Sequence, residues 1–286
     1  MGTSNTDKLN YEVVEGWGKL PEGWIFTQVA GVAVDSQDRV YVYNRGEHPL
    51  IIFDHEGNFL TSWGEGLLTR GGHGIFIDDD DYVYLADRAM QTVMKFTSEG
   101  ERLLTLGTEG QANEGKPFNN LTDVALSPSG EIYVSDGYGN SLVHKFSADG
   151  TLLLSWGEPG SEAGQFNLPH SVWVDRQERV YVADRENHRI QIFTSEGEFI
   201  TMWTGFRQPT DLFIDDDDKL YISELQHRVS IVNLDGEILT RLGGEKIDAP
   251  GQFIAPHGVW TDSQNSLYVG EVLEGQKIQK FLTRQC

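Results

Sequence analysis

Three histidines of this chain occur in one recurring sequence setting. His73, His170 and His257 each stand directly before a short, mainly apolar segment that ends in an aspartate. Neutral imidazole is the usual nitrogen ligand of zinc, and three histidines with an open fourth position are typical of catalytic zinc sites. The same ligands also suit iron, manganese or cobalt. We therefore predict that these three histidines bind Zn²⁺ or another divalent transition metal.

The equivalent place in three further copies of this setting holds Ala30, Thr122 and Thr210, so that histidine occurs in every second copy. If the six copies form a closed ring, alternate copies lie about 120° apart around its axis. Three imidazoles would then converge from three directions and leave the axial direction open. Three separate histidines with local hydrogen bonds are the alternative, but the recurrence at equivalent places favours the metal site.

A second place where the copies differ is the loop before the third apolar segment. Arg45 and Tyr138 occupy this loop in two copies, and we expect both to line the channel. An arginine can hold a carboxylate through two parallel hydrogen bonds, and a tyrosine beside a dication can serve as acid or base. A salt bridge and a packed ring are the alternatives. Arg88 and Arg185 recur at one loop position, which favours a structural role for them.

The elements that must position these residues are visible as internal repeats. Segments resembling Gly31-Val-Ala-Val-Asp35 recur six times at intervals of 40 to 49 residues. In each copy a polar turn, a second strand such as Val40-Tyr-Val-Tyr-Asn44, a loop and a third strand follow. A fourth strand usually ends in Trp-Gly or Leu-Gly. Six units of four short strands predict an all-β fold, a six-bladed β-propeller of four-stranded antiparallel blades.

The two ends of the chain indicate how the ring closes. The sixth unit ends after its third strand, whereas residues 11–18 contain Gly16-Trp17-Gly18, which matches the missing fourth-strand ending. We therefore expect an N-terminal strand to complete the last blade, because a closed ring leaves no open sheet edge. Residues 1–286 are predicted to form a single domain.

Composition narrows the classes of partner. The 286 residues include 22 Lys and Arg against 44 Asp and Glu, for a net charge of −22, which argues against nucleic acids and anionic membranes as partners. The single cysteine, Cys286, excludes disulfides within the chain and clusters of cysteine ligands. The sequence shows neither an apolar run long enough to span a bilayer nor a signal peptide, so we expect a cytoplasmic protein; a removed signal would leave no trace here.

Two acidic runs resemble calcium ligands. Asp78–Asp81 and Asp215–Asp218 fall in the turns between first and second strands, where other copies carry other polar residues. The EF-hand pattern is absent. We interpret both runs as solvated turns.

Several sequence segments resemble those of known protein families. Asp184-Arg185-Glu186-Asn187 resembles the NHL repeat, and residues 166–171, 182–187, 136–141 and 44–48 resemble the lyase domain of peptidylglycine α-amidating enzymes. The resemblance implies a six-bladed propeller that cleaves peptidyl-α-hydroxyglycine to a peptide amide and glyoxylate. It also implies a catalytic zinc on His73, His170 and His257, a carboxylate-binding Arg45 and a catalytic Tyr138.

The chain departs from this family at the third histidine. The family has Met-Pro-His-Asp there, and its aspartate helps to bind a structural calcium; this chain has Ala255-Pro256-His257-Gly258. We therefore do not expect structural Ca²⁺ at that place. The sequence also contains no monooxygenase domain. The resemblance to this family therefore supports the metal site more strongly than it supports a peptide substrate.

The leading hypothesis is a metal-dependent lyase that cleaves the C–N bond of a small α-hydroxy amide or carbinolamide. Its substrate would be a small molecule that carries a carboxylate or an amide. The first alternative is a metal-dependent hydrolase of an ester, lactone or amide at the same site. The second is a non-catalytic propeller scaffold that binds a basic partner. The sequence does not predict an oligomeric state.

Overall fold

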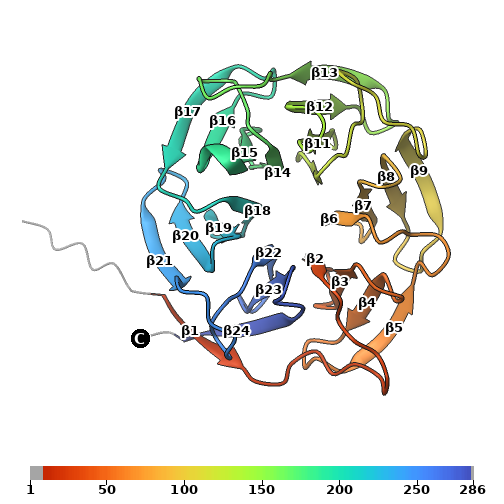
Figure 1. Ribbon diagram of the computed structural model, residues 1–286, viewed down its shortest axis with the longest axis vertical. Coiled ribbons are helices and arrows are strands. Elements are labelled where there is room, and N and C mark those ends of the chain that lie inside the picture. The colour runs from red at the N-terminus through yellow and green to blue at the C-terminus, as the bar shows by residue number, and fades with distance from the viewer. Residues whose placement is uncertain (1–8, 285–286) are drawn as a thin grey trace, which may run out of the picture.

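Every repeat unit forms one four-stranded antiparallel sheet, and the six sheets stand like blades around a common axis (Figure 1). The computed structural model describes residues 9–284, so Cys286 lies outside the described residues. Arg185–Asn187 forms a single 3₁₀ turn, and the described residues include no helix long and apolar enough to cross a membrane. The predicted six-bladed, all-β propeller is therefore confirmed.

Each blade is built outward from the axis. The innermost strands are β2 (Val29–Val34), β6 (Gly72–Ile77), β10 (Asp123–Leu126), β14 (Pro169–Val174), β18 (Pro209–Ile214) and β22 (Pro256–Thr261). The second strands are β3 (Val40–Asn44), β7 (Val83–Asp87), β11 (Ile132–Asp136), β15 (Val180–Asp184), β19 (Lys219–Glu224) and β23 (Leu267–Glu271). The third strands are β4 (Leu50–Phe53), β8 (Thr92–Phe96), β12 (Leu142–Phe146), β16 (Arg189–Phe193), β20 (Arg228–Asn233) and β24 (Ile278–Arg284). The outer strands are β5 (Phe59–Trp63), β9 (Arg102–Gly107), β13 (Leu152–Trp156), β17 (Phe199–Thr204), β21 (Ile238–Gly243) and β1 (Asn10–Val14). We number the blades 1 to 6 in the order of their innermost strands.

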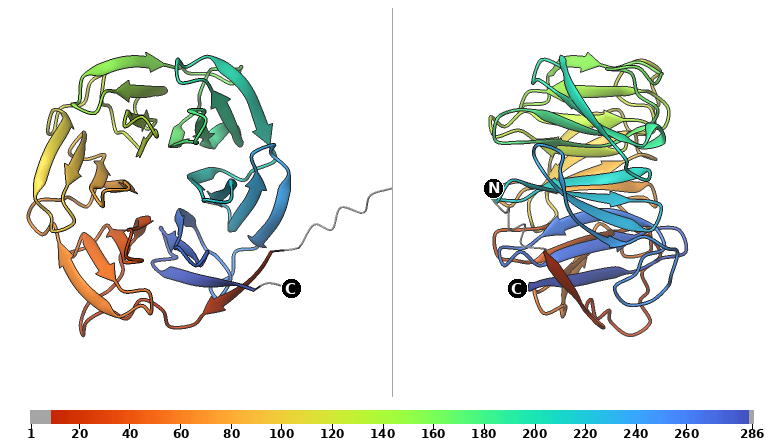
Figure 2. Two further views of the ribbon diagram at one scale, coloured as in Figure 1. Left: turned by 180° about the vertical axis from the view of Figure 1, so that it is seen from behind. Right: turned by 90° about the vertical axis from the view of Figure 1, so that its left-hand side faces the viewer.

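The N-terminal strand closes the ring, as predicted. β1 pairs antiparallel with β24, so that the two ends of the described chain share blade 6 (Figure 2). Trp17 follows β1 and is buried, with its ring 5.4 Å from that of Phe53 in blade 1 and 5.0 Å from that of Tyr268 in blade 6. This indole therefore joins the first blade to the last.

The recurring aspartate after each innermost strand explains the repeated turn. Asp175 accepts the backbone N–H groups of Gln177 and Arg179 at 2.9 Å each, and its second oxygen accepts the hydroxyl of Tyr181 at 3.1 Å. Such side-chain to backbone bonds stabilise tight turns. Aspartates at the same place accept the corresponding turn N–H groups in four further blades: Asp35, Asp78, Asp215 and Asp262. The first residue of each acidic run is thus part of the turn, and its neighbours Asp79 and Asp216 are exposed.

A β-bulge shapes the inner end of most blades. In blade 4, Pro169 pairs with Asp184 and Ser171 pairs with Ala183, so His170 is an extra residue in the innermost strand. The same shift occurs in blades 1, 2, 5 and 6. A bulge changes the direction of a side chain. It lets two consecutive residues of one strand, such as Thr210 and Asp211, line the same small cavity on the axis.

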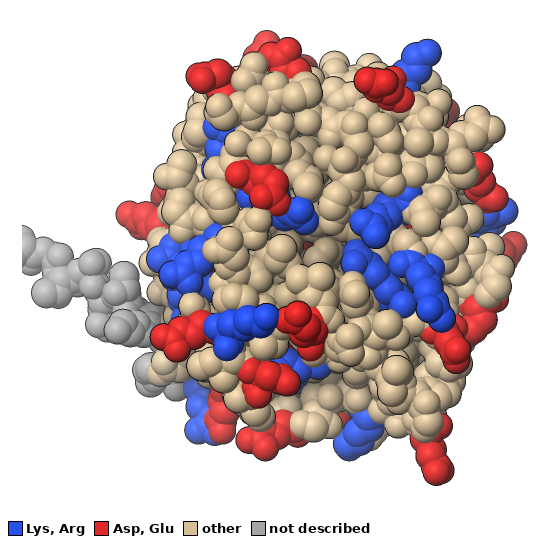
Figure 3. Space-filling view, in the orientation of Figure 1, with Lys and Arg blue, Asp and Glu red and all other residues tan. Residues whose placement is uncertain are grey.

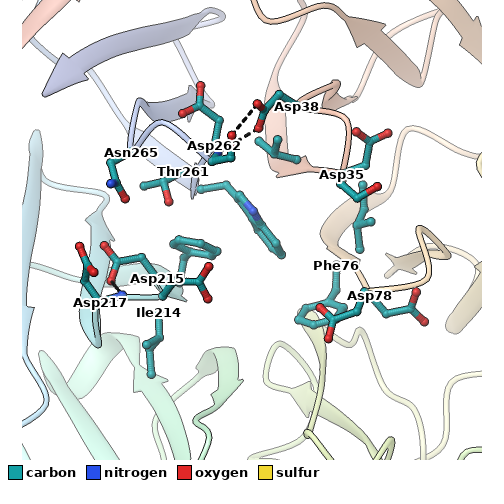
Figure 4. A pocket seen from close by; sticks show the side chains of 18 of the residues that line it. Asp35, Asp38, Phe76, Asp78, Ile214, Asp215, Asp217, Thr261, Asp262 and Asn265 are labelled. Carbon is teal, nitrogen blue, oxygen red and sulfur yellow. Dashed lines mark hydrogen bonds between the residues drawn. The ribbon is translucent and has the colours of Figure 1, made fainter.

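Aromatic rings fill the axis further along the channel. Phe76, Trp173, Phe213 and Trp260 come from four innermost strands, each three residues after the bulge position, and their ring centroids lie 4.6–5.7 Å apart. They form the floor of a pocket of about 460 Å³ at the far mouth, where the turn aspartates surround them (Figure 4). This aromatic cluster separates the far mouth from the histidines.

Candidate metal centre

His73, His170 and His257 meet on the propeller axis. Their side chains are only 1–4% exposed, and their ring centroids lie 4.7–4.9 Å from one another. One nitrogen of each ring lies within 4.8 Å of the corresponding nitrogens of the other two. The convergence that the alternating repeats predict is therefore present in the structure.

The blades without histidine orient the rings. Nδ1 of His170 donates to the carbonyl of Thr210 at 2.6 Å, and Nδ1 of His257 donates to the carbonyl of Ala30 at 2.6 Å. A carbonyl can only accept, so the proton of each neutral ring is on Nδ1 and the lone pair is on Nε2. Hydrogen bonding of the distal nitrogen to a carbonyl is the usual support of a metal-binding histidine. The three histidines of blades 2, 4 and 6 share one repeat position, which we call the ring position. Ala30 and Thr210 occupy it in blades 1 and 5.

All three imidazoles are held in the neutral form. Burial, followed by the proximity of His170 and His257, lowers the pKa of His73 well below its ordinary value. Burial also lowers the pKa of His170 and of His257 well below that value, and nearby arginines act in the same direction. Three neutral, converging imidazoles, two of them oriented by backbone carbonyls, fit the ligand set of a divalent transition metal.

Tyr138 covers the open side of the triad. Its hydroxyl lies 3.2 Å from Nε2 of His73 and 3.2 Å from Nε2 of His170. The residue belongs to the loop between β11 and β12 in blade 3, and it is 36% exposed. The predicted catalytic tyrosine thus contacts both the histidines and the solvent at this mouth.

Arg45 lies beside the triad, as expected. Its Nε donates to the carbonyl of Gly72 at 2.8 Å and its Nη1 donates to Gln28 at 3.1 Å, whereas its buried Nη2 has no partner among the described residues. Burial lowers the pKa of Arg45, and the charge of Arg88 lowers it further, although Tyr138 acts in the opposite direction. The guanidinium therefore has one unused donor nitrogen at the site.

Two further arginines reach the same mouth. The guanidinium carbons of Arg88 and Arg185 lie 5.2 and 5.5 Å from the ring centroid of Tyr138, and Nη1 of Arg185 lies 3.4 Å from its hydroxyl. Basic side chains accordingly lie close to the centre of this face, despite the net negative charge (Figure 3). The recurrence of these arginines at one repeat position favours structural roles. Their loops in blades 2 and 4 flank the loop of Tyr138 in blade 3, which is the sequence signal that places them near this tyrosine.

A second polar layer lies directly behind the histidines. Ser171 lies with its hydroxyl 2.6 Å from Asp123 and 3.0 Å from Asp211, and Asp211 also accepts the N–H groups of Leu212 and Val259 at 2.9 Å. Burial raises the pKa of Asp123 to about 7; burial and the charge of Asp123 raise that of Asp211 well above its ordinary value. These carboxylates were not predicted from the sequence, although Asp123 directly follows Thr122 and Asp211 directly follows Thr210.

Glycines at the equivalent positions of other blades are closely packed. A Cβ atom on Gly74 would lie 2.1 Å from a carboxylate oxygen of Asp123, and one on Gly258 would lie 2.8 Å from Cα of Gly31. The place where the similar family has its calcium-binding aspartate therefore has no room for a larger side chain. The carboxyl groups of this layer belong to blades 3 and 5 instead.

Histidines outside the triad have protein partners. His144 is buried between Asp136, at 3.1 Å, and Ser155, at 2.7 Å. His48 stacks on Trp24 with a centroid distance of 3.3 Å. Neither residue belongs to the group of potential metal ligands.

The proteins that are similar to this chain include some that are named as enzymes. The NHL repeat model matches residues 118–146 and 166–193, which include parts of blades 3 and 4. Human NHL repeat-containing protein 3 is 35% identical over 216 residues, which cover 70% of this chain and 61% of that protein. Peptidyl-alpha-hydroxyglycine alpha-amidating lyase 1 of Drosophila melanogaster is 30% identical over 211 residues, covering 63% of this chain and 38% of that protein. The aligned parts thus span less than two thirds of both curated relatives.

A solved structure supports the architecture alone. A streptogramin B lyase structure superposes with a TM-score of 0.69 at 12% identity and covers 96% of this chain and 98% of that one. At such low identity the likeness concerns the fold. Taken together, the comparisons show that this six-bladed β-propeller contains NHL repeats at residues 118–146 and 166–193 and is similar to the peptidyl-α-hydroxyglycine α-amidating lyases.

Proposed function

We propose that this chain is a metal-dependent lyase that cleaves the C–N bond of an N-acyl-α-hydroxyglycine or a closely similar α-hydroxy amide. The observation that carries the proposal is the position of the Tyr138 hydroxyl, 3.2 Å from two Nε2 atoms of the histidine triad. An acid–base group and three converging ligands share one point on the axis. The similarity to the named Drosophila lyase supports the same chemistry.

In the proposed reaction the substrate hydroxyl loses its proton, the bond between the carbinol carbon and nitrogen breaks, and the nitrogen gains a proton. The products are an amide and a carbonyl acid, glyoxylate in the simplest case, and no water is consumed. A divalent metal on His73, His170 and His257 would supply a Lewis acid for the substrate oxygen.

Tyr138 would move the proton. In the proposed reaction its phenolate oxygen removes the proton of the substrate hydroxyl and then delivers one to the departing nitrogen. Nη1 of Arg185, 3.4 Å from this oxygen, offsets the negative charge that it carries when it has no proton. Tyr138 lies in a loop and is partly exposed to solvent, so in the proposed reaction its hydroxyl can move between the substrate hydroxyl and the departing nitrogen.

Arg45 would orient the substrate. Its buried Nη2 has no partner in the part of the chain that the structure describes. Because a buried donor without an acceptor is costly, we infer that this nitrogen binds a carboxylate of the substrate. With Nε and Nη1 fixed by Gly72 and Gln28, the group has little freedom to turn away. A carboxylate on the carbinol carbon would thus be held beside the triad.

The test is an assay with N-acetyl-α-hydroxyglycine on protein of measured metal content. We expect acetamide and glyoxylate in equal amounts, and no product from N-acetylglycine, which lacks the hydroxyl. In water labelled with oxygen-18 the acetamide should contain no label. Labelled acetate would instead support the alternative hydrolase, and well under one equivalent of retained metal would support a binding scaffold.

A further inference from the structure

The mouth above the triad holds more positive charge than one substrate carboxylate can satisfy. Arg45, Arg88 and Arg185 surround Tyr138 from blades 1, 2 and 4. Arg185 is paired with Glu186 through Nε at 2.9 Å, and Arg45 has a single free nitrogen. Arg88 is the group that the proposed reaction does not use.

Arg88 has an entirely free guanidinium group. Neither a hydrogen bond nor an ion pair engages its side chain within residues 9–284; its contact is the ring of Tyr138, 5.2 Å away. The adjacent carboxylate is not available, because Asp87 is buried and accepts hydrogen bonds from Thr69, Ala89 and Met90.

The backbone around Arg88 is held in place. Its N–H donates to the carbonyl of Gly71 at 3.1 Å, and its carbonyl accepts the side-chain amide of Gln91 at 2.7 Å. The contacts of Asp87 to the two following N–H groups fix the same turn. The side chain therefore projects from a rigid base over Tyr138.

A free guanidinium matches a carboxylate through two parallel hydrogen bonds. We propose that Arg88 is a specificity-determining residue that binds a second acidic group on the substrate, carried on its acyl side. The preferred substrate class is then an N-acyl-α-hydroxyglycine with two carboxylates. This inference rests on the proposed function for the identity of the first carboxylate, which Arg45 binds.

The net negative charge of the chain opposes the binding of a dianion. At a net charge of −22, long-range electrostatics disfavour a dianion relative to a monoanion. A preference for the dianion must therefore arise from local cations at the binding site.

Binding of unreactive analogues tests the inference without turnover. N-Succinylglycine carries two carboxylates, whereas N-succinamoylglycine has nearly the same shape and one. Isothermal titration of the metal-loaded protein at 0.15 M salt should give a Kd at least about tenfold lower for the dianion, as expected for a charge-assisted pair. Arg88→Gln should abolish this preference by weakening the dianion alone, and Arg88→Lys should keep part of it.

Arg102→Gln provides the matched control. Arg102 lies on outer strand β9 and pairs with Glu109, so its loss changes the net charge equally without reaching the mouth. The preference should remain in this variant. Equal affinity of the wild-type protein for both analogues, or a preference that survives in Arg88→Gln, would overturn the inference. Because neither analogue can react, such a failure is distinct from a failure of the lyase assay.

Discussion

Nδ1 of His170 lies 2.6 Å from the backbone carbonyl of Thr210, the residue at the same position in the next blade. The neighbouring blade thus fixes the tautomer and the direction of the ring. His257 and Ala30 repeat the relationship between blades 6 and 1. Two of the three histidines are therefore each oriented by the backbone of the next blade, which carries no histidine at that position.

Removal of one triad member should abolish metal binding. His73→Ala, His170→Ala and His257→Ala each leave two imidazoles, and we expect the retained transition metal to fall from about one equivalent to near zero. Elemental analysis after gel filtration measures this. The control is His188→Ala, an exposed loop histidine, which should keep its metal. Full retention in all three triad variants would contradict the site.

Loss of the Tyr138 hydroxyl should separate chemistry from metal binding. Tyr138→Phe removes the proton-transfer group but none of the three histidines, so we expect kcat to fall about 10²- to 10⁴-fold while the metal content stays the same. Glyoxylate release and elemental analysis on the same sample give both values. Unchanged kcat would remove Tyr138 from the proposed mechanism.

Substitution of Arg45 should act mainly on substrate binding. Arg45→Gln removes the charge that would face the substrate carboxylate, and we expect kcat/KM to fall about 10- to 100-fold, mostly through KM. Arg45→Lys should rescue little, because a single ammonium nitrogen cannot take the separate positions of the Nε, Nη1 and Nη2 atoms of the guanidinium. A full rescue by lysine would show that charge alone matters there.

Metal retention should persist in mildly acidic solution. Protons compete with a metal for the histidine lone pairs, and burial lowers the pKa of all three rings below the ordinary value of about 6.5. Protonation of the folded site therefore begins only below that pH. We expect full metal content after dialysis at pH 6, with loss at lower pH. Half-loss near or above pH 6.5 would contradict the lowered pKa values.

We expect Trp17, which joins blades 1 and 6, to contribute strongly to the free energy of unfolding. Trp17 is buried between blades 1 and 6, and Trp17→Ala should lower the free energy of unfolding by about 3–5 kcal/mol. Ile25→Ala, at a side chain that is 71% exposed, should change it by less than about 0.5 kcal/mol. Urea denaturation compares the two variants, and equal effects would argue against the closure by Trp17.

The sequence revealed the features that recur. Periodic strands predicted the blades, the unmatched Gly16-Trp17-Gly18 predicted the closing strand, and histidine at alternate ring positions predicted the convergence of the triad. These inferences need only the rule that equivalent positions of a closed ring are equivalent in space.

Contacts between side chains of different blades escaped the same reasoning. Asp123 and Asp211 share the hydroxyl of Ser171 across three blades, and Arg88 reaches Tyr138 across two. The rotation of each blade and the bulge at its inner end decide such contacts, and neither is encoded in one local pattern. Recurrence favours a structural role for Arg88 and Arg185, and their position at the mouth becomes visible only in the three-dimensional arrangement of the loops.

The aromatic cluster of Phe76, Trp173, Phe213 and Trp260 has a consequence for the kind of molecule that can react. These rings close the central channel between the histidines and the far mouth, so a polymer cannot pass through the channel beyond the histidines. In the proposed reaction, a polymeric substrate would have to present its reacting group at a chain end, because the rest of the chain could not pass the aromatic rings. The length of that remainder would then have little influence on access to the histidines.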